Sequence, residues 1–350
     1  MKVVQLNDYG PPDDNLTVVD VADPLLPGPG EVLLQMLATP VNPADMAFCW
    51  GRYKSRPTLP CIPGGEGVGR VIAVGYGVTE PVPGDLVLPL DEGNWTEMRL
   101  CSQTKLMNLP QGIDPLQAAM LRANPPTASL LLSDVVSLGV GDWLIQNVAN
   151  SATGRLVIRL ASKRGLHTVN LVRRKEIVPE LEALGADVCI VGDDDLPRRV
   201  HQATGGAKIR LALDALAGEA TARLSECVTD EGTVCCYGSM TGVDPVMRRS
   251  AVVFRDVRLV GFTLRRVLAR YEPAEIKALY SRLARGVLDG SLVSQVEAIY
   301  SIENAVDAVR HAMRPGRSGK VLILPEPGMA TTAFDKPGTV AQGRPAGCWP

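Results

Sequence analysis

The stretch Asp142-Trp-Leu-Ile-Gln-Asn-Val-Ala-Asn-Ser-Ala-Thr-Gly154 decides the fold of this 350-residue chain. Its apolar first half predicts a buried strand, and the periodicity of Arg155-Leu-Val-Ile-Arg-Leu-Ala-Ser-Lys-Arg predicts a helix that ends at Gly165. The turn between them is where a phosphate-binding turn would lie, because small residues there let the backbone approach phosphate groups closely. Only Gly154 remains of the usual glycines, so an ordinary tight turn is the alternative.

Strands alternate with helices downstream of this stretch. We expect strands at 168–173, 187–191, 209–214 and 232–238, an edge strand at 258–264, and helices near 180–185, 273–288 and 302–313. This alternation predicts a doubly wound parallel sheet of the Rossmann type, with residues 119–314 as a dinucleotide-binding domain.

The N-terminal part has a different pattern. Short apolar runs at 31–37, 69–75 and 85–90 are bounded by turn signals such as Pro27-Gly-Pro-Gly and Pro83-Gly-Asp. Such runs predict an all-β, partly closed barrel over residues 1–118, to which a strand at 315–325 returns. Residues 326–350 are rich in Pro, Gly and Ala without periodicity, which predicts a flexible tail.

Composition excludes several classes of protein. A net charge of −2 gives no electrostatic attraction to nucleic acid or to an anionic membrane. No apolar run approaches the roughly 20 residues that span a bilayer. The N-terminal Met1-Lys-Val-Val-Gln-Leu has a strand pattern rather than that of a secretion or transit signal, so we expect a cytoplasmic protein.

Cysteine and histidine spacing gives no sign of a metal site. The eight cysteines contain no Cys-x-x-Cys pair, and the three histidines lie far apart in the sequence. We therefore expect neither a disulfide framework nor a structural zinc site, and we interpret Cys235 and Cys236 as buried, inert thiols.

The end of the second expected strand carries three cations, Arg173, Arg174 and Lys175. An NAD enzyme usually has a carboxylate there that binds the ribose 2′-hydroxyl. Guanidinium groups would instead pair with a 2′-phosphate, so this position predicts NADPH as the cofactor. The alternative is a solvated basic helix start.

Several short motifs, in order and in near-constant spacing, resemble one known family. They are Arg122-Ala-Asn-Pro-Pro-Thr-Ala128, Ile145-Gln-Asn-Val-Ala-Asn-Ser151, Thr168-Val-Asn-Leu-Val-Arg173, Leu184-Gly-Ala-Asp187, Tyr237-Gly-Ser-Met240 and Gly261-Phe262. From about residue 1 to 324 the chain resembles the mitochondrial-type 2-enoyl thioester reductases, zinc-independent members of the medium-chain dehydrogenase/reductase superfamily. The resemblance implies a GroES-like barrel domain beside the Rossmann domain.

The resemblance also implies an activity. Family members use NADPH to add hydride to C3 and a proton to C2 of a trans-2-enoyl thioester. Their proton-donating tyrosine lies in a Gly-x-Tyr segment before a Leu-Pro, which here assigns that role to Tyr53 of Gly51-Arg-Tyr53, ahead of Leu59-Pro60. We expect the flanking Arg52 and Lys54 to lower the pKa of Tyr53. Without the resemblance, Tyr53 would be interpreted as a loop aromatic that covers a pocket.

Further site residues follow from the same resemblance. The implied NADPH contacts are Asn124, Asn150, Ser151, Ala152, Thr153, Arg173, Arg174, Lys175, Tyr237, Gly238, Ser239, Met240, Phe262, Thr263, Leu264 and Lys320. Asn42 and Trp95 are expected at the substrate pocket. Zinc-bearing relatives have a Gly-His-Glu ligand motif where this chain reads Gly64-Gly-Glu-Gly67, so we expect no metal.

The partners and the competing functions remain predictions at this point. We expect an acyl thioester substrate on coenzyme A or acyl carrier protein, and a homodimer formed through the edge strand at 258–264. The nearest rival is a zinc-free NADPH quinone oxidoreductase, and an ene reductase for a secondary metabolite would use the same chemistry. A non-catalytic NADPH-binding protein of the crystallin type is the rival from another class.

Overall fold

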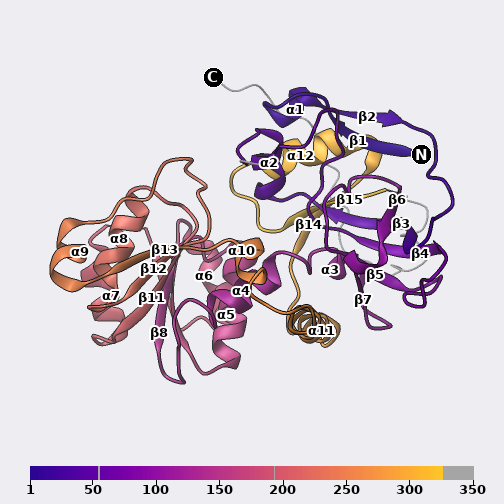
Figure 1. Cartoon of the computed structure of the whole chain (residues 1–350). Coiled ribbons are helices and arrows are strands. Elements are labelled where there is room, and N and C mark those ends of the chain that lie inside the picture. The colour runs from indigo at the N-terminus through magenta and orange to yellow at the C-terminus, as the bar shows by residue number, and fades with distance from the viewer. Residues whose placement is uncertain (54–55, 193, 326–350) are drawn as a thin grey trace. The chain divides into compact units, whose positions relative to one another are not determined.

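The computed structural model describes residues 1–53, 56–192 and 194–325, so Lys54 and the expected tail lie outside the described residues. The chain forms two compact units (Figure 1). Unit 1 contains residues 1–111 and the chain from Gln295 onward, and unit 2 contains Gly112–Ser294.

Unit 2 is built on a parallel sheet. Its strand order is β10 (Val188–Val191), β9 (His167–Val172), β8 (Trp143–Gln146), β11 (Ile209–Asp214), β12 (Thr233–Cys236) and β13 (Arg258–Gly261). From β8 the chain adds β9 and β10 on one side of the sheet, and then adds β11, β12 and β13 on the other side. Doubly wound sheets bind ligands at the carboxyl ends of the strands beside the point where the strand order reverses in this way, which here lies between β8 and β11. The predicted Rossmann-type sheet is confirmed.

Helices cover both faces of this sheet. The cores on the two faces differ: α5 (Ala152–Lys163) and α6 (Val178–Ala183) enclose one with Ile158 and Leu181, whereas α7 (Leu196–Thr204) and α8 (Glu219–Cys227) enclose the other (Figure 1). The remaining helices of the unit are α3 (Pro115–Ala118), α4 (Asn124–Leu131), α9 (Arg249–Arg255), α10 (Leu264–Leu268) and α11 (Pro273–Leu288). No helix in the described part of the chain combines the length and apolarity needed to cross a membrane.

Unit 1 is a curved, mostly antiparallel sheet. The order is β14 (Val296–Ser301), β15 (Lys320–Leu324), β3 (Glu31–Pro40), β4 (Val68–Val74), β5 (Leu86–Pro89) and β7 (Leu106–Asn108). β6 (Met98–Ser102) also pairs with β3, whereas β1 (Lys2–Leu6) and β2 (Leu16–Asp20) form a separate ribbon. Because β3 pairs with β15, β4 and β6, the sheet wraps around apolar side chains such as Leu34 and Met36 and gives the predicted partly closed barrel.

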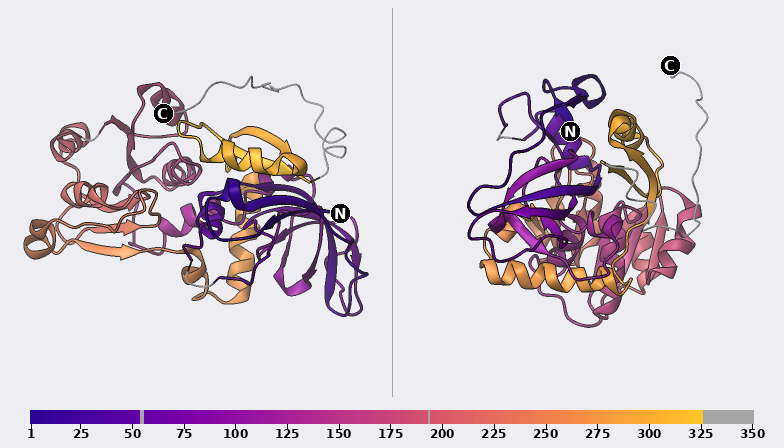
Figure 2. Two further views of the ribbon diagram at one scale, coloured as in Figure 1. Left: turned by 90° about the horizontal axis from the view of Figure 1, so that it is seen from above. Right: turned by 90° about the vertical axis from the view of Figure 1, so that its right-hand side faces the viewer.

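The expected domain boundaries need correction, because the chain returns to unit 1 at Gln295 rather than at residue 315. β14 pairs with β15 in parallel, and α12 (Ala305–Met313) buries Ala308 and Val309 in the same core as Leu6. In Figure 2 this helix, in yellow, lies beside the N-terminal elements, in agreement with its contacts to α1 (Pro12–Asn15) and β2. A strand–helix–strand pattern looks alike in either domain, so the sequence pattern could not show that residues 295–314 belong to unit 1. The first boundary likewise falls at 111/112 instead of 118/119.

Candidate functional site

The turn between β8 and α5 has the construction of a phosphate-binding turn. Ser151 caps α5, with its hydroxyl accepting a hydrogen bond from the backbone N–H of Gly154 at 3.1 Å. A Cβ at Gly154 would lie 2.6 Å from the carbonyl oxygen of Ala149, so only glycine allows this close packing. α5 starts at Ala152, at the carboxyl end of β8, where its free N–H groups and dipole favour an anion.

A buried polar ladder that the sequence analysis did not identify holds this turn against the sheet. The Gln146 side-chain amide donates to the Gly154 carbonyl at 3.0 Å and to Oδ1 of Asn170 at 2.8 Å. Asn170 in turn donates to the Thr168 hydroxyl at 2.8 Å. The three side chains are fully buried. The signal that could have identified this ladder in the sequence is the presence of polar residues inside two otherwise apolar strands.

Two buried polar groups at the same edge of unit 2 lack full partners. The Thr153 hydroxyl donates to Oδ1 of Asn124 at 3.0 Å, which leaves the Asn124 Nδ2 buried and unpaired within the described residues. The Tyr237 hydroxyl is buried beside Ser151 without a well-aligned hydrogen bond, and burial raises the pKa of Tyr237. Buried hydrogen-bond donors normally have acceptors, so the Asn124 amide and the Tyr237 hydroxyl fit a site in which a bound polar ligand supplies the missing hydrogen bonds.

The three predicted cations follow β9 directly and are solvent-exposed. Among the described residues, the side chains of Arg173, Arg174 and Lys175 make no ion pair. No carboxylate occupies the end of this strand, since Glu176, which is also exposed, lies beyond all three cations. These residues therefore fit a 2′-phosphate better than a ribose diol.

The segments after β12 and β13 also lie at this edge. The Tyr237 backbone N–H donates to the Asp214 carbonyl at 2.9 Å, and a Cβ at Gly238 would lie 2.9 Å from the Ala215 carbonyl oxygen. After β13, Phe262 is 5% exposed, so it can offer a ligand little but its backbone. The other predicted members of these segments, Ser239, Met240, Thr263 and Leu264, retain some exposure, as does Asn150 in the phosphate-binding turn.

A second network missed by the sequence analysis lies where the strand order reverses. The fully buried Asp214 carboxylate, at the end of β11, accepts hydrogen bonds at 2.6 Å from the Asn147 side-chain amide and from the Thr221 hydroxyl. It also accepts from the backbone N–H groups of Leu216 and Ala217. The network therefore joins the ends of β8 and β11 and fixes the loop that follows β11.

Tyr53 lies in unit 1, in the segment after α2 (Pro43–Cys49), with 47% of its surface exposed. Its pKa is raised, first by partial burial and then by the negative charges of Asp45 and Glu92. The expected lowering of this pKa is wrong, because the Arg52 guanidinium lies over the Trp50 ring, 5.5 Å from its centroid. Tyr53 therefore remains a protonated phenol at neutral pH, as a proton donor must be.

Beneath this segment lies a buried cluster of Asn42, Asp45, Glu66 and Lys320. The Lys320 ammonium donates to Oδ1 of Asn42, whose side-chain amide donates to Glu66 at 2.7 Å. Burial lowers the pKa of Lys320, opposed by Glu66 and Asp45, and burial raises the pKa of Asp45 to about 6. Lys320 is only 7% exposed and binds Asn42 within unit 1, and its expected contact with NADPH stays a prediction.

The segment before Lys320 is held by a carboxylate that the sequence analysis did not identify. Glu297 of β14 accepts hydrogen bonds from the backbone N–H groups of Ser318 at 2.7 Å and Gly319 at 2.9 Å. Its other oxygen lies 3.1 Å from Nε2 of His311, whose Nδ1 lies 2.9 Å from the Tyr300 hydroxyl. This chain of contacts fixes the backbone that leads into Lys320.

The expectation that Trp95 borders the substrate channel is corrected by its burial. Trp95 has no exposed surface and belongs to the core that contains Val4 and Leu6. Its ring covers Gly64, where a Cβ would lie 2.4 Å from the Trp95 Cδ1 atom. Trp95 thus explains the glycine at position 64 and contributes packing rather than a wall open to substrate.

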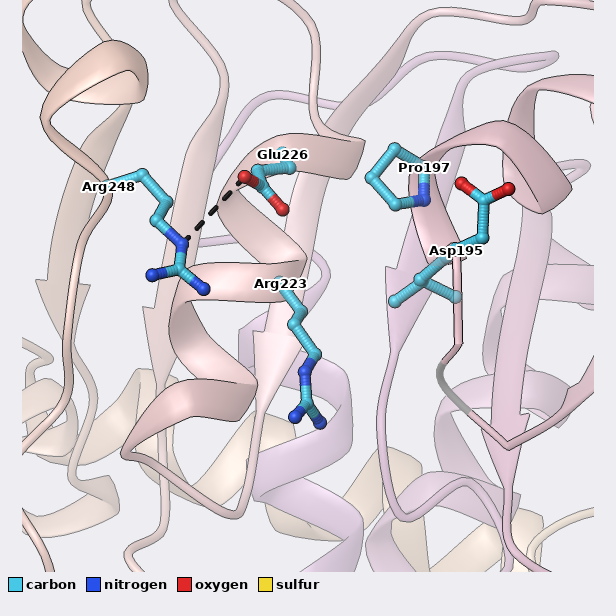
Figure 3. A pocket seen from close by; sticks show the side chains of 6 residues that line it. Asp195, Pro197, Arg223, Glu226 and Arg248 are labelled. Atoms are coloured by element: carbon cyan, nitrogen blue, oxygen red, sulfur yellow. Dashed lines mark ion pairs between the residues drawn. The ribbon is translucent and has the colours of Figure 1, made fainter.

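Two further features lie outside this site. Within the described residues, no group of three or more His, Cys, Asp or Glu side chains is placed to hold a metal ion. A hollow of about 530 Å³ lies beside the start of α7 and along α8 (Figure 3), where Arg248 faces Glu226 at 3.8 Å. Since carboxylates and arginines both line it and no predicted site residue does, we assign it no role in the site.

Two family models match the chain. Residues 28–111 match the alcohol dehydrogenase GroES-like domain, and residues 152–285 match the model described as zinc-binding dehydrogenase. Each match falls within one of the two structural units.

Known proteins similar to this chain include enoyl reductases and a quinone reductase. Mitochondrial enoyl-[acyl-carrier-protein] reductase of Rattus norvegicus is 32% identical over 92% of this chain and 85% of its own length, and that of Mus musculus is 33% identical over the same shares. A putative NADPH:quinone reductase from Bacillus thuringiensis has a TM-score of 0.86 at 29% identity, covering 93% of this chain and all but 1% of its own. Etr1p in complex with NADP and crotonyl-CoA has a TM-score of 0.83 at 25% identity, with 92% of this chain and 99% of Etr1p covered. The chain therefore belongs to the family of the enoyl-[acyl-carrier-protein] reductases, within the medium-chain dehydrogenase/reductase superfamily.

Proposed function

We propose that this protein is an NADPH-dependent reductase that saturates the 2,3 double bond of a trans-2-enoyl thioester. Its relatives are named enoyl-[acyl-carrier-protein] reductases, and Etr1p binds NADP and crotonyl-CoA. The observation that carries the proposal is the half-exposed side chain of Tyr53, whose pKa is raised by partial burial and which the proposal makes the proton donor.

Unit 2 holds the cofactor in this proposal. The start of α5 and the capped turn bind the pyrophosphate, and Arg173, Arg174 and Lys175 bind the 2′-phosphate. The unpaired Asn124 amide and the buried Tyr237 hydroxyl supply polar contacts to the rest of the cofactor. NADPH, when bound, supplies the hydride that adds to C3 of the substrate.

Unit 1 supplies the proton. Hydride addition at C3 moves negative charge onto the thioester oxygen, and a hydrogen-bond donor there lowers the barrier. The Tyr53 O–H can donate that hydrogen bond and then give its proton to C2. The buried cluster of Asn42, Asp45, Glu66 and Lys320 holds the base of this segment, because Asp45 accepts from the backbone N–H groups of Asn42 and Gly65 at 2.8 Å.

The partner and location are further parts of the proposal. We propose a homodimer formed by the exposed β13 edge, and an acyl carrier of either the coenzyme A or the carrier-protein kind. The cytoplasmic location stays a prediction, since the relatives named above are mitochondrial proteins.

A second candidate function is NADPH:quinone reduction, favoured by the high similarity to the Bacillus thuringiensis structure. A quinone is a flat conjugated carbonyl that takes hydride by the same chemistry. The two functions differ in their demand on Tyr53, because a thioester enolate must be protonated at carbon whereas a reduced quinone exchanges protons with water.

The test is NADPH oxidation with crotonyl-CoA, with longer trans-2-enoyl-CoAs and with benzoquinone, each at several concentrations. We expect a kcat/KM for at least one enoyl-CoA that exceeds that for benzoquinone by more than tenfold. Turnover of quinone alone would establish the second function. Tight NADPH binding without turnover of either substrate would indicate a non-catalytic protein.

A further inference from the structure

Arg155 is a buried arginine of α5 that the proposed cofactor contacts do not include. It is 9% exposed and directly follows Gly154, near the start of the helix. A positive charge near a helix N-terminus opposes the helix dipole, and burial of a guanidinium costs solvation energy. Because apolar residues in place of a buried ion pair are often as stable or more stable, stability alone does not account for an arginine here.

The Arg155 guanidinium connects the phosphate-binding turn to α6. Its Nε donates to the carbonyl oxygen of Asn150, in the turn, at 2.9 Å. Its two terminal nitrogens donate to the two carboxylate oxygens of Glu180, and the contact of Nη2 measures 3.0 Å. A bidentate pair of this kind fixes the plane of the guanidinium and thereby the direction of its Nε–H group. Glu180, in the first turn of α6, therefore orients the group that holds Asn150.

α6 is a fixed support for this contact. Leu181, the neighbour of Glu180, is fully buried in a core that also contains Ala149 of the turn and Val172 of β9. The Glu180 side chain is 42% exposed, so it reaches Arg155 from the rim of this core. The ion pair therefore ties the turn to a helix whose own place is set by packing.

The turn needs such a support because its backbone is strained. Val148 has a φ of +49°, which a β-branched residue rarely adopts. A conformation of this kind persists only where the surrounding contacts impose it. The Val148 carbonyl accepts from the Ser151 N–H at 2.9 Å, and the Asn150 carbonyl accepts from Arg155. A carbonyl oxygen turned toward a bound phosphate would repel it, and Arg155 holds the Asn150 carbonyl on the guanidinium instead.

We propose that Arg155, braced by Glu180, is a positioning residue of the dinucleotide site that holds the phosphate-binding turn in the conformation that receives the pyrophosphate. This inference rests on the proposed function, which places the pyrophosphate at this turn. The cations at 173–175 do not depend on the brace, because they follow β9 directly and β9 is paired with a strand on either side. Arg155 therefore affects the binding of the pyrophosphate and not that of the 2′-phosphate.

The test measures cofactor binding without turnover, by fluorescence titration with NADPH and NADH. Arg155→Met keeps an unbranched side chain for packing and removes every hydrogen-bond donor. We expect the dissociation constants of NADPH and NADH to rise by the same factor, roughly tenfold or more, since both cofactors carry the pyrophosphate. The affinity for adenosine 2′-monophosphate, measured by competition with NADPH, should not change, because this probe has no pyrophosphate.

Three further variants separate positioning from a loss of stability. Arg155→Lys keeps a cation without the guanidinium fork, so we expect an intermediate dissociation constant for NADPH. Glu180→Ala should weaken NADPH binding on its own but cause no further loss when added to Arg155→Met. Arg210→Met is the matched control, because Arg210 of β11 also donates to a carboxylate, that of Asp142, and to a backbone carbonyl, that of Ser137, each at 2.8 Å. This control should leave the NADPH affinity unchanged.

Unchanged binding of NADPH and NADH by Arg155→Met would overturn the proposal. An equal loss of affinity for adenosine 2′-monophosphate would also overturn it, since Arg155 would then only stabilise unit 2 as a whole. Additive effects of Arg155→Met and Glu180→Ala would refute the brace. If circular dichroism shows that Arg155→Met does not fold, Arg155→Lys takes its place, with the same split between the two cofactors and adenosine 2′-monophosphate as the expected result. Failure of the wild type to bind NADPH would instead refute the proposed function.

Discussion

The Lys320 ammonium donates a hydrogen bond to the side-chain oxygen of Asn42, although 278 residues separate them in the sequence. The bond joins β15, the returning strand of unit 1, to the residue that precedes α2. Both side chains are buried, together with Glu66 and Asp45, so the base of the Tyr53 segment contains two carboxylates opposed by a lysine.

Removing the cation should destabilise unit 1. In Lys320→Met, Glu66 and Asp45 lose their compensating charge, and breaking a buried ion pair costs about 3–5 kcal/mol. The double variant Lys320→Met with Glu66→Gln should recover part of that loss, because one carboxylate becomes neutral. Urea unfolding followed by circular dichroism measures both. A single variant within about 1 kcal/mol of the wild type would show that the cluster is unimportant for stability.

Asp45 should make stability depend on pH in a defined direction. Its pKa in the folded protein is about 6, above the roughly 3.9 of an unfolded chain. Between these values the folded state keeps a proton that the unfolded state has lost, so this contribution is complete below pH 4 and is lost as pH rises through 6. The shift corresponds to roughly 3 kcal/mol.

The variant Asp45→Asn isolates this contribution, since its side chain is neutral at every pH. Measured against this variant, the wild type should lose stability steadily from about pH 4 to pH 7. Denaturant midpoints at half-unit pH intervals provide the comparison. A difference between the two proteins that does not vary with pH would mean that Asp45 has the same pKa in the folded and the unfolded state.

Tyr53→Phe tests the proposed proton donor. The ring remains and the hydroxyl is lost, so folding and NADPH binding should be unchanged while kcat on crotonyl-CoA falls by roughly 10²–10⁴. Loss of a transition-state contact lowers kcat and kcat/KM together, whereas loss of packing raises KM alone. Tyr76→Phe, at a tyrosine that is 88% exposed in the same unit, is the control. Retention of most of the wild-type kcat would mean that Tyr53 only covers the pocket and does not donate the proton.

Arg173→Ala tests the choice of cofactor. A charge-assisted pair with phosphate contributes roughly 1.5–3 kcal/mol, so the KM for NADPH should rise about tenfold or more while the KM for NADH stays constant. Arg282→Ala on α11, another exposed arginine of unit 2, should change neither value. Equal use of NADPH and NADH by the wild-type enzyme would contradict the assignment.

The edge of the unit 2 sheet predicts a homodimer. β13 is exposed along its length, with Leu259 and Val260 each 38% exposed, and Phe254 of α9 is 72% exposed. An uncovered apolar edge strand is a ready template for pairing, and a two-fold axis closes it. Light scattering at micromolar concentration should give twice the chain mass. Val260→Lys should yield monomer, and Val140→Lys, at a valine that is 87% exposed elsewhere in unit 2, should not.

The sequence by itself determined the local features of this protein. The apolar strand, the small-residue turn and the periodic helix at 142–165 predict the Rossmann unit, because each depends on neighbouring residues whose pattern the chain states directly. The cations at Arg173–Lys175 were placed correctly at the end of a strand for the same reason. The alternation of strand and helix could not show which sheet β14 and α12 join, since that depends on the partner strand, β15.

Only the tertiary structure decided the environment of the site. The charge next to Tyr53 in sequence predicted a lowered pKa, whereas burial and Asp45, eight positions away, raise it. Trp95 became a core residue because it packs on Gly64, and Lys320 became part of a buried cluster because β15 lies beside the end of β3. Burial and electrostatic interactions depend on distances in space, and residues remote in sequence set those distances.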